Sequence, residues 1–211
     1  MHRSTLSRAK LYGIVDLGYA APSSLTRITG EMIEGGIDVI QLRAKGHAEG
    51  EVRNWAEALL PLCRQAGVPF LINDHAAIAA AIGADGVHVG QDDASMEEVR
   101  ALVGDEAMVG RSTHSLAQAT AAATDLRTDY IGFGPLFATP TKPTYPPIGT
   151  AEIRAVHEQH PHLPIFCIGG IKKEHLPALV KAGARRVVIV SGILQATGIA
   201  AYVRAARALL P

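Results

Sequence analysis

The alternation of short apolar runs with Ala- and Leu-rich amphipathic stretches constrains the fold of this chain more than any other feature. The apolar runs lie at residues 11–15, 38–43, 69–74, 86–90, 108–112, 130–137, 165–171 and 187–193. Helices are expected between them at 24–35, 49–66, 75–82, 95–102, 115–124, 150–159, 173–181 and 197–209. Continuous apolar runs are typical of parallel strands that are covered on both faces.

A strand followed by a helix, repeated along 211 residues, predicts an α/β protein with the architecture of a single-domain (β/α)8 TIM barrel. A doubly wound open sheet is the structural alternative, and it usually carries a G-x-G-x-x-G turn after its first strand. The stretch "LYGIVDLGYAAP" at 11–22 lacks that turn. Because no linker or composition shift divides the chain, we expect one domain over 1–211, with 1–10 as a flexible N-terminal segment.

Charge and hydropathy narrow the classes of partner. The chain has 20 Lys and Arg against 20 Asp and Glu, so no overall field attracts nucleic acid or an anionic membrane. No apolar stretch reaches the roughly 18 residues of a membrane span, and "LYGIV" is too short for a signal peptide. We therefore expect a cytoplasmic protein with small-molecule partners, and both a monomer and a homo-oligomer are compatible with these features.

The two cysteines predict no chemistry of their own. Cys63 falls in an expected helix and Cys167 in an expected strand, far apart in the sequence. Two such residues make neither a disulfide framework nor a metal cluster. Free cysteines are usually buried, and we expect both to be inert thiols of the core.

Polar residues gather where the second strand ends. Gln41, Arg43 and Lys45 alternate along it and therefore share one face. Active sites of barrels lie at the carboxyl ends of the strands. Two cations and an amide at this place are costly unless an anion meets them, although Lys45 alone is also explained as a solvated loop charge.

Carboxylates follow the third and fourth strands. Asn73 and Asp74 end "FLIND", and Asp92 and Asp93 end "GVHVGQDD". Mg²⁺ prefers one or two carboxylates together with water and substrate phosphates. Each aspartate could instead cap the helix that follows it, but the neighbouring Arg43 favours a site for a metal and a phosphate.

The fifth strand completes the first anion site, which strands 2 to 5 form, and strands 7 and 8 suggest a second anion site. Strand 5 ends in "GRSTHS", where Ser112 or Thr113 could donate to a phosphate, while His114 could be a base or a helix cap. The glycines of "IGGI" and Ser191 follow strands 7 and 8, where many barrels bind phosphate, although tight turns would also explain the glycines. Between the two sites runs the loop that contains Thr139, Thr141 and Lys142.

Taken together, the motifs "QLRAK", "ND", "DGVHVGQDD", "GRSTHS", "DYIGFGPLFATPTK", "CIGGI" and "VSGI" resemble those of the thiamine-phosphate synthase family over about residues 11–205. The resemblance implies a TIM barrel that condenses 4-amino-2-methyl-5-hydroxymethylpyrimidine diphosphate with 4-methyl-5-(2-phosphoethyl)thiazole, in its plain or carboxylated form. It also implies one Mg²⁺ per chain and a dissociative displacement of pyrophosphate.

The resemblance also implies the role of each site residue. The pyrimidine diphosphate would be held by Gln41, Arg43, Lys45, Asn73, Ser112 and Lys142, of which Arg43, Lys45, Ser112 and Lys142 would serve catalysis. The thiazole phosphate would be held by Thr139, Thr141, Gly170, Val190 and Ser191. Asp74 and Asp93 would ligate Mg²⁺, with Asp93 preferred because Asp92 falls at a variable position of the family.

Two other functions fit part of the pattern. "GRSTHS" and "VSGI" also resemble the related thiazole tautomerases, in which His114 would be the acid–base residue. That family typically lacks the aspartate at Asp93 and the full Thr-x-Thr-Lys motif, both of which this chain has. A non-catalytic phosphate sensor is the third alternative, and Asp74, Asp93 and Lys142 argue against it. Ala138 stands where the synthases often have proline.

Overall fold

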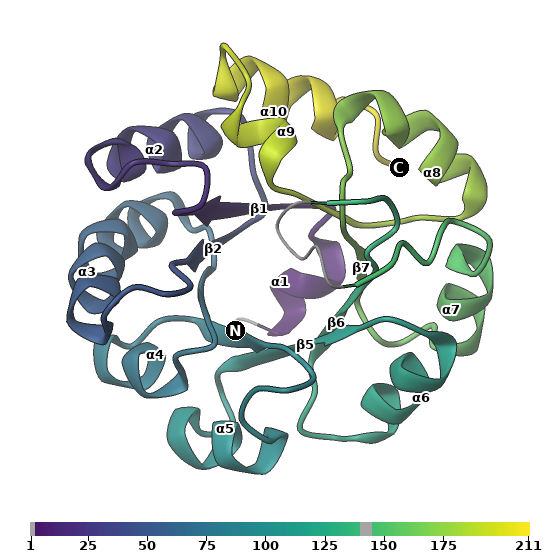
Figure 1. The fold of residues 1–211 in the computed structure, drawn as a ribbon, viewed down its shortest axis with the longest axis horizontal. Coiled ribbons are helices and arrows are strands. Elements are labelled where there is room, and N and C mark those ends of the chain that lie inside the picture. The colour runs from purple at the N-terminus through teal and green to yellow at the C-terminus, as the bar shows by residue number, and fades with distance from the viewer. Residues whose placement is uncertain (1–2, 140–144) are drawn as a thin grey trace.

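The chain folds into a closed barrel of parallel strands. The computed structural model describes residues 3–139 and 145–211. Within these ranges, eight strands pair in sequence order and the last pairs with the first, and Figure 1 shows them as the inner ring. The strands are β1 (Leu11–Asp16), β2 (Val39–Arg43), β3 (Phe70–Asn73), β4 (Gly86–Val89), β5 (Met108–Thr113), β6 (Tyr130–Phe133), β7 (Ile165–Cys167) and β8 (Val187–Ile189).

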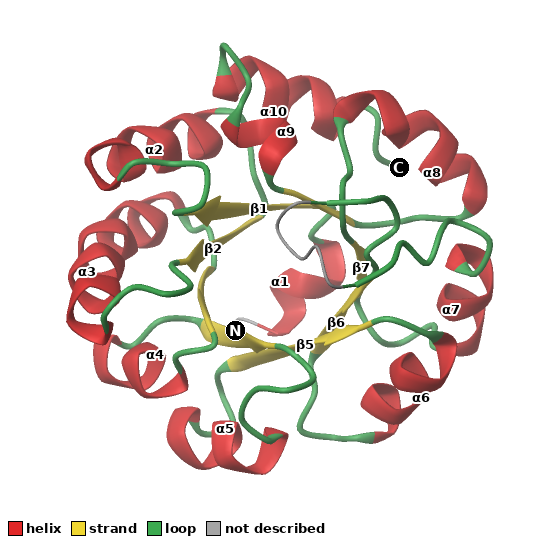
Figure 2. Cartoon of the chain, viewed as in Figure 1, coloured by secondary structure: helices red, strands yellow, loops and turns green. Residues whose placement is uncertain are grey.

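Helices surround this ring, as Figure 2 shows. They are α2 (Leu25–Glu34), α3 (Glu49–Ala66), α4 (Ala76–Ile82), α5 (Met96–Val103), α6 (Leu116–Thr124), α7 (Ile153–Gln159), α8 (Leu176–Ala182), α9 (Ser191–Leu194) and α10 (Ile199–Ala208). Glycines end two of these helices: Gly67 and Gly83 follow α3 and α4 with φ of 66° and 68°, a left-handed conformation that favours glycine. The predicted (β/α)8 barrel is confirmed.

The N-terminal segment differs from the flexible stretch that the sequence suggested. Arg3–Arg8 form helix α1, which lies within the ring of strands in Figure 1. Leu6 and Ala9 are buried and pack with Tyr12, Met108 and Phe166. Helix α1 is held against the barrel because these apolar side chains fill the end that the strand residues leave open.

Three strands are markedly shorter than predicted because the chain turns early to build the barrel mouth. The expected run 165–171 ends its strand at Cys167. The expected run 130–137 ends its strand at Phe133, before Pro135, which has no N–H for a ladder. The expected run 187–193 ends at Ile189, and Ser191–Leu194 form α9. Polar and glycine residues after these points are therefore free of the sheet and available to a site.

The core has two parts. One lies between strands and helices and contains the buried Cys63 and Cys167. Burial raises the pKa of each thiol to about 12, and the prediction that both cysteines lie in the core is confirmed. The other part fills the barrel interior below the mouth. In the part of the chain that the structure describes, no helix is long and apolar enough to cross a membrane.

Candidate active site

A pocket opens at the carboxyl ends of the strands and reaches into the barrel. Most of the predicted site residues line it: Gln41, Arg43, Asn73, Ser112, Thr139, Gly170, Val190 and Ser191. Thr141 and Lys142 lie outside the described residues. The pocket also contains Tyr12, His88, Tyr130 and Phe166, which the sequence did not single out for this site.

The face of β2 is held by two residues of β1. The register between these strands places Asp16 beside Arg43, and Arg43 Nη1 donates to Asp16 Oδ2 at 2.8 Å. Gln41 Nε2 donates to Tyr12 Oη at 2.7 Å. Asp16 is 2% exposed, so the guanidinium of Arg43 is fixed at the pocket by a buried countercharge. An acidic residue ending the first strand was the only sequence signal for this partner.

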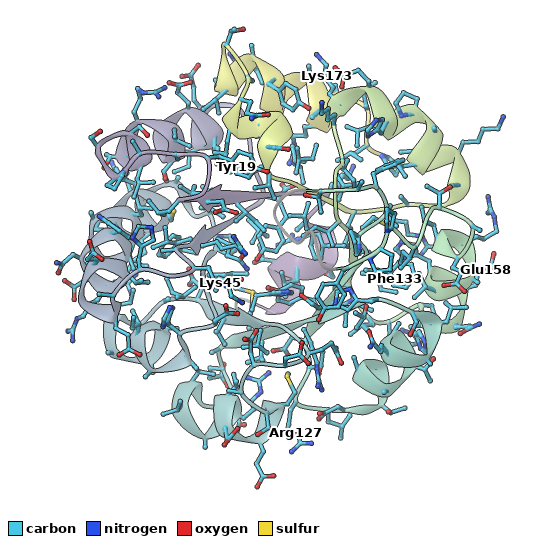
Figure 3. All side chains as sticks on the ribbon, viewed as in Figure 1. Tyr19, Lys45, Arg127, Phe133, Glu158 and Lys173 are labelled. Atoms are coloured by element: carbon cyan, nitrogen blue, oxygen red, sulfur yellow. The ribbon has the colours of Figure 1, made fainter. Side chains whose placement is uncertain are left out.

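Asp74 and Asp93 lie together beside the pocket, with Lys45 next to them. Lys45 Nζ lies 3.6 Å from Asp74 Oδ2, and Figure 3 shows Lys45 inside the ring of helices, unlike Arg127 and Glu158 on the periphery. Burial of the Asp74 carboxyl, the charge of Asp93 and a hydrogen bond between the two side chains raise the pKa of Asp74. Asp74 has a φ of 65°, uncommon for a residue other than glycine.

The helix-capping alternative for these aspartates is not what the structure shows. Ser95 caps α5, accepting from Glu98 N at 3.2 Å, and α4 has no side-chain cap. Asp93 Oδ2 instead accepts from Gly90 N at 2.7 Å. Two adjacent carboxylates that repel each other fit a divalent cation, which would relieve the repulsion. Among the described residues no third Asp, Glu, His or Cys joins them, so substrate and water oxygens would complete the ligand set.

Ser112 and Thr113 both line the pocket, but the Thr113 hydroxyl is engaged within the sheet. Thr113 is fully buried and its hydroxyl donates to Gly132 O on β6 at 2.9 Å. Ser112 Oγ lies 3.0 Å from His88 Nε2, and His88 Nδ1 lies 3.1 Å from Tyr130 Oη. Of the two hydroxyls that the sequence offered, Ser112 is therefore the one available to a ligand. Because alternate residues of a strand point to the same face, the position of His88 in "GVHV" is consistent with a side chain that points into the barrel.

His114 also lines the pocket and is not a helix cap. Ser115 caps α6 as predicted, while His114 Nδ1 contacts Gly134 O. The imidazole stacks on Tyr145, with ring centroids 4.2 Å apart. Tyr145 Oη donates to Asp92 Oδ2 at 3.0 Å. These contacts join the loop after β6 to the loops after β4 and β5, so His114 has a packing role at the mouth.

The loops after β6 and β7 are joined by backbone hydrogen bonds. Leu136 N donates to Ile168 O at 2.8 Å and Phe137 N donates to Gly169 O at 3.0 Å. Gly170 has a φ of 65°, and a Cβ there would lie 2.7 Å from Ala138 O. Only glycine fits this approach, which brings Gly170 close to the segment bearing Thr139. Ser191 begins α9 on the neighbouring strand end, so the second cluster of predicted residues is also assembled.

Comparisons with known proteins identify one family. A family model described as "Thiamine monophosphate synthase" matches residues 11–193. The thiamine-phosphate synthase of Pelotomaculum thermopropionicum is 41% identical over 208 residues, covering 98% of this chain and 94% of the relative. That of Thermus thermophilus is 43% identical over 192 residues, covering 91% and 90%.

A solved structure, the thiamine phosphate pyrophosphorylase from Pyrococcus furiosus, superposes with a TM-score of 0.84 at 28% identity, covering 98% of this chain and 96% of that one. The family resemblance inferred from the motifs is thereby confirmed, and with it the assignment as an enzyme. The chain belongs to the thiamine monophosphate synthase family, and its activity is the synthesis of thiamine phosphate in thiamine biosynthesis.

Proposed function

We propose that the pocket joins 4-amino-2-methyl-5-hydroxymethylpyrimidine diphosphate to the thiazole phosphate by a Mg²⁺-assisted dissociative displacement. The observation that carries this proposal is the convergence of opposite charges at one side of the pocket. Lys45 and Arg43 both act on the Asp74 carboxyl, which in turn contacts Asp93. Paired carboxylates among cations suit a metal-bound diphosphate better than a neutral ligand.

The pyrimidine diphosphate lies along the β2, β3 and β5 side in this proposal. Gln41 meets the pyrimidine, and Arg43, Lys45, Asn73 and Ser112 meet the diphosphate. Asp16 fixes the Arg43 guanidinium before substrate arrives. Positive charge that is already oriented costs no reorganisation when negative charge develops on the leaving group. Lys142, through the family resemblance alone, adds a further cation.

The thiazole phosphate lies on the opposite side, at the loops after β6, β7 and β8. Gly170, Val190, Ser191 and Thr139 all line this side of the pocket; in this proposal the first two would offer backbone groups and the last two their hydroxyls. The backbone pairing of the two loops fixes this cradle. Thr141 is proposed to help through the family resemblance. A phosphate held here would direct the thiazole ring toward the β2 side of the pocket.

The chemistry needs charge stabilisation more than proton transfer. The C–O bond to the diphosphate breaks and the diphosphate leaves with the electron pair, while the amino group of the pyrimidine stabilises the cation. The thiazole nitrogen then forms the new C–N bond with its own lone pair. It has no proton to lose, so no general base is required. Apolar walls such as Phe166 and Ile168 keep water from the cation.

Asp74 and Asp93 would hold the Mg²⁺, which when bound supplies positive charge to the departing diphosphate. A thiamine-phosphate assay with both precursors, with and without Mg²⁺, tests the proposal. Product only with Mg²⁺ is expected. If the protein is folded and binds thiazole phosphate but forms no product, the proposed condensation is contradicted. That result would favour the tautomerase alternative, in which His114 is the acid–base residue.

A further inference from the structure

Five polar side chains form a continuous chain of hydrogen bonds through the barrel interior. Gln41 Nε2 lies 2.7 Å from Tyr12 Oη, which lies 3.3 Å from Tyr130 Oη. The chain continues from Tyr130 Oη to His88 Nδ1 at 3.1 Å and from His88 Nε2 to Ser112 Oγ at 3.0 Å. Its ends, Gln41 and Ser112, both line the pocket. The chain therefore connects the proposed pyrimidine contact with the proposed diphosphate contact.

Such a chain has two self-consistent directions when the imidazole is neutral. In the first, Gln41 donates to Tyr12, each tyrosine hydroxyl donates onward, and His88 Nε2–H donates to Ser112 Oγ. In the second, every hydrogen is reversed, and the Ser112 hydroxyl donates to His88. Each phenol has one hydrogen and a neutral imidazole has one N–H, so reversing one link forces the others to reverse.

At the Gln41 end, the hydrogen bonds of this chain run in the first direction, because the amide nitrogen of Gln41 donates to Tyr12. Gln41 is 1% exposed, and its Oε1 is buried without a hydrogen-bond partner among the described residues. A buried acceptor left unpaired costs about 1–3 kcal/mol. A ligand with an N–H group at this wall of the pocket would therefore supply the missing donor to Gln41 Oε1.

We propose that this chain couples the two ends of the pocket, with His88 as the positioning residue that sets the direction. In the first direction, Gln41 Oε1 is left to accept a hydrogen bond from a ligand, and the Ser112 hydroxyl, which accepts from His88, is left to donate one. The substrate that satisfies both has an amino-substituted heterocycle at one end and an anionic diphosphate at the other. This inference rests on the proposed function for the diphosphate contact of Ser112, and it deepens that function by making recognition of the ring and of the phosphates a single event.

Burial supports the coupling. Tyr12 and Tyr130 are 2% and 0% exposed, and burial raises the pKa of both phenols. Each therefore keeps its one hydrogen at every pH at which the protein would be assayed. The ring of Tyr130 is also fixed in place, since a Cβ at Gly110 would lie 2.0 Å from its Cζ. Glycine at that position leaves just enough room for the ring.

Nitrogen-15 NMR of histidine-labelled protein tests the direction without turnover, since the two neutral tautomers of imidazole differ in the shifts of both nitrogens. We expect the Nε2–H tautomer for His88 in the complex with Mg²⁺ and inorganic pyrophosphate. The His88→Gln variant assigns the signal, and if that variant does not fold, the shift caused by Ser112→Ala assigns it. An Nδ1–H tautomer in the complex overturns the proposal.

Kinetics test the coupling between the ends. Ser112→Ala should lower kcat/KM for the pyrimidine diphosphate by about 30-fold in the native background, as expected for loss of a charge-assisted hydrogen bond. In a Tyr130→Phe background, or Tyr12→Phe if that variant folds better, the further loss should be under about fivefold, because Ser112 has already lost its fixed direction.

Tyr202→Phe is the matched control, because its hydroxyl accepts from Lys173 N outside the chain. Its effect should multiply with that of Ser112→Ala. Multiplicative effects of Tyr130→Phe and Ser112→Ala would overturn the coupling. If instead the wild-type protein gives the expected tautomer but no thiamine phosphate, the proposed function fails while the direction of the chain stands, so the two failures are distinguishable.

Discussion

Asp16 and Arg43 stand side by side on adjacent strands, and the carboxylate of the first holds the guanidinium of the second at 2.8 Å. The side chains are 2% and 14% exposed. This pair combines stability with function, because the charge that is proposed to stabilise the leaving diphosphate is half-buried and has a buried countercharge. The Asp16 carboxylate offsets the cost of burying part of the Arg43 guanidinium when no anion is bound.

Removal of that countercharge should damage both stability and activity. Asp16→Asn leaves the half-buried guanidinium of Arg43 uncompensated, and breaking a fully buried pair in this way typically costs about 3–5 kcal/mol. We expect a loss near the lower end, since Arg43 also faces the pocket, together with a fall in kcat/KM of about tenfold. Urea unfolding and steady-state kinetics measure the two effects.

The exposed pair Arg27–Glu31 provides the control for Asp16→Asn, because exposed helix pairs contribute at most about 0.5 kcal/mol. Glu31→Gln should therefore change neither stability nor rate measurably. An Asp16→Asn protein as stable as Glu31→Gln would contradict the role given to this carboxylate.

The metal assignment predicts a specific response to substitution at Asp93. Asp93→Ala should remove Mg²⁺-dependent turnover while leaving the fold intact, because its carboxylate contacts Asp74 and the Gly90 backbone at the barrel mouth, outside the core. Mg²⁺ titration by calorimetry with pyrophosphate, and circular dichroism for the fold, check this. Glu106→Gln, at an exposed acidic loop, serves as the control, and an Asp93→Ala enzyme with normal turnover would exclude Asp93 as a ligand.

Helix α1 should contribute measurable stability. Leu6 is 1% exposed and packs in the barrel interior, and truncation of a buried leucine costs about 2–5 kcal/mol. Leu6→Ala should therefore lower the free energy of unfolding by about 2 kcal/mol or more. Leu126→Ala, at a side chain that is 93% exposed, should change it by less than about 0.5 kcal/mol. Equal effects of the two substitutions would show that the N-terminal segment does not close the barrel.

Stability should fall in mild acid because of His157. The pKa of His157 is lowered to about 4, mainly by burial and to a smaller extent by the charges of Arg185 and Arg186. In the unfolded chain a histidine has a pKa of about 6.5. Between these values the unfolded state binds a proton that the native state does not, so stability is lost as the pH falls. The loss amounts to about 2 kcal/mol at pH 5.

Urea unfolding at about pH 7.5 and pH 5 tests this linkage. His157→Gln should lose less stability between the two conditions than the native sequence, while His160→Gln, whose imidazole is hydrogen-bonded at the surface, should keep the native dependence. Parallel losses in all three proteins would assign the acid sensitivity to other groups.

The sequence was enough to predict the barrel, because each strand and helix has its own local pattern. It also predicted Gln41, Arg43 and Ser112, since polar residues directly after apolar runs stand out. Asp16 and Tyr12 did not stand out, because their importance comes from the register between β1 and β2. The hydrogen-bonded chain through His88 and Tyr130 was missed for the same reason, because it runs across five strands and its partners are set by the register between them. The helix α1 was missed because a single buried leucine in a basic segment is not a periodic pattern.

The position of α1 bears on the order of events in catalysis. With Leu6, Met108 and Phe166 filling the barrel below the pocket, the described residues leave the approach at the carboxyl ends of the strands. Gln41 is almost fully buried, whereas the loops that bear Thr139 and Ser191 lie nearer that approach. In the proposed arrangement, a pocket with a closed floor favours entry of the pyrimidine precursor before the thiazole phosphate, because the pyrimidine contact at Gln41 is the more deeply buried. In the same arrangement the product would leave by the same route with its thiazole end foremost.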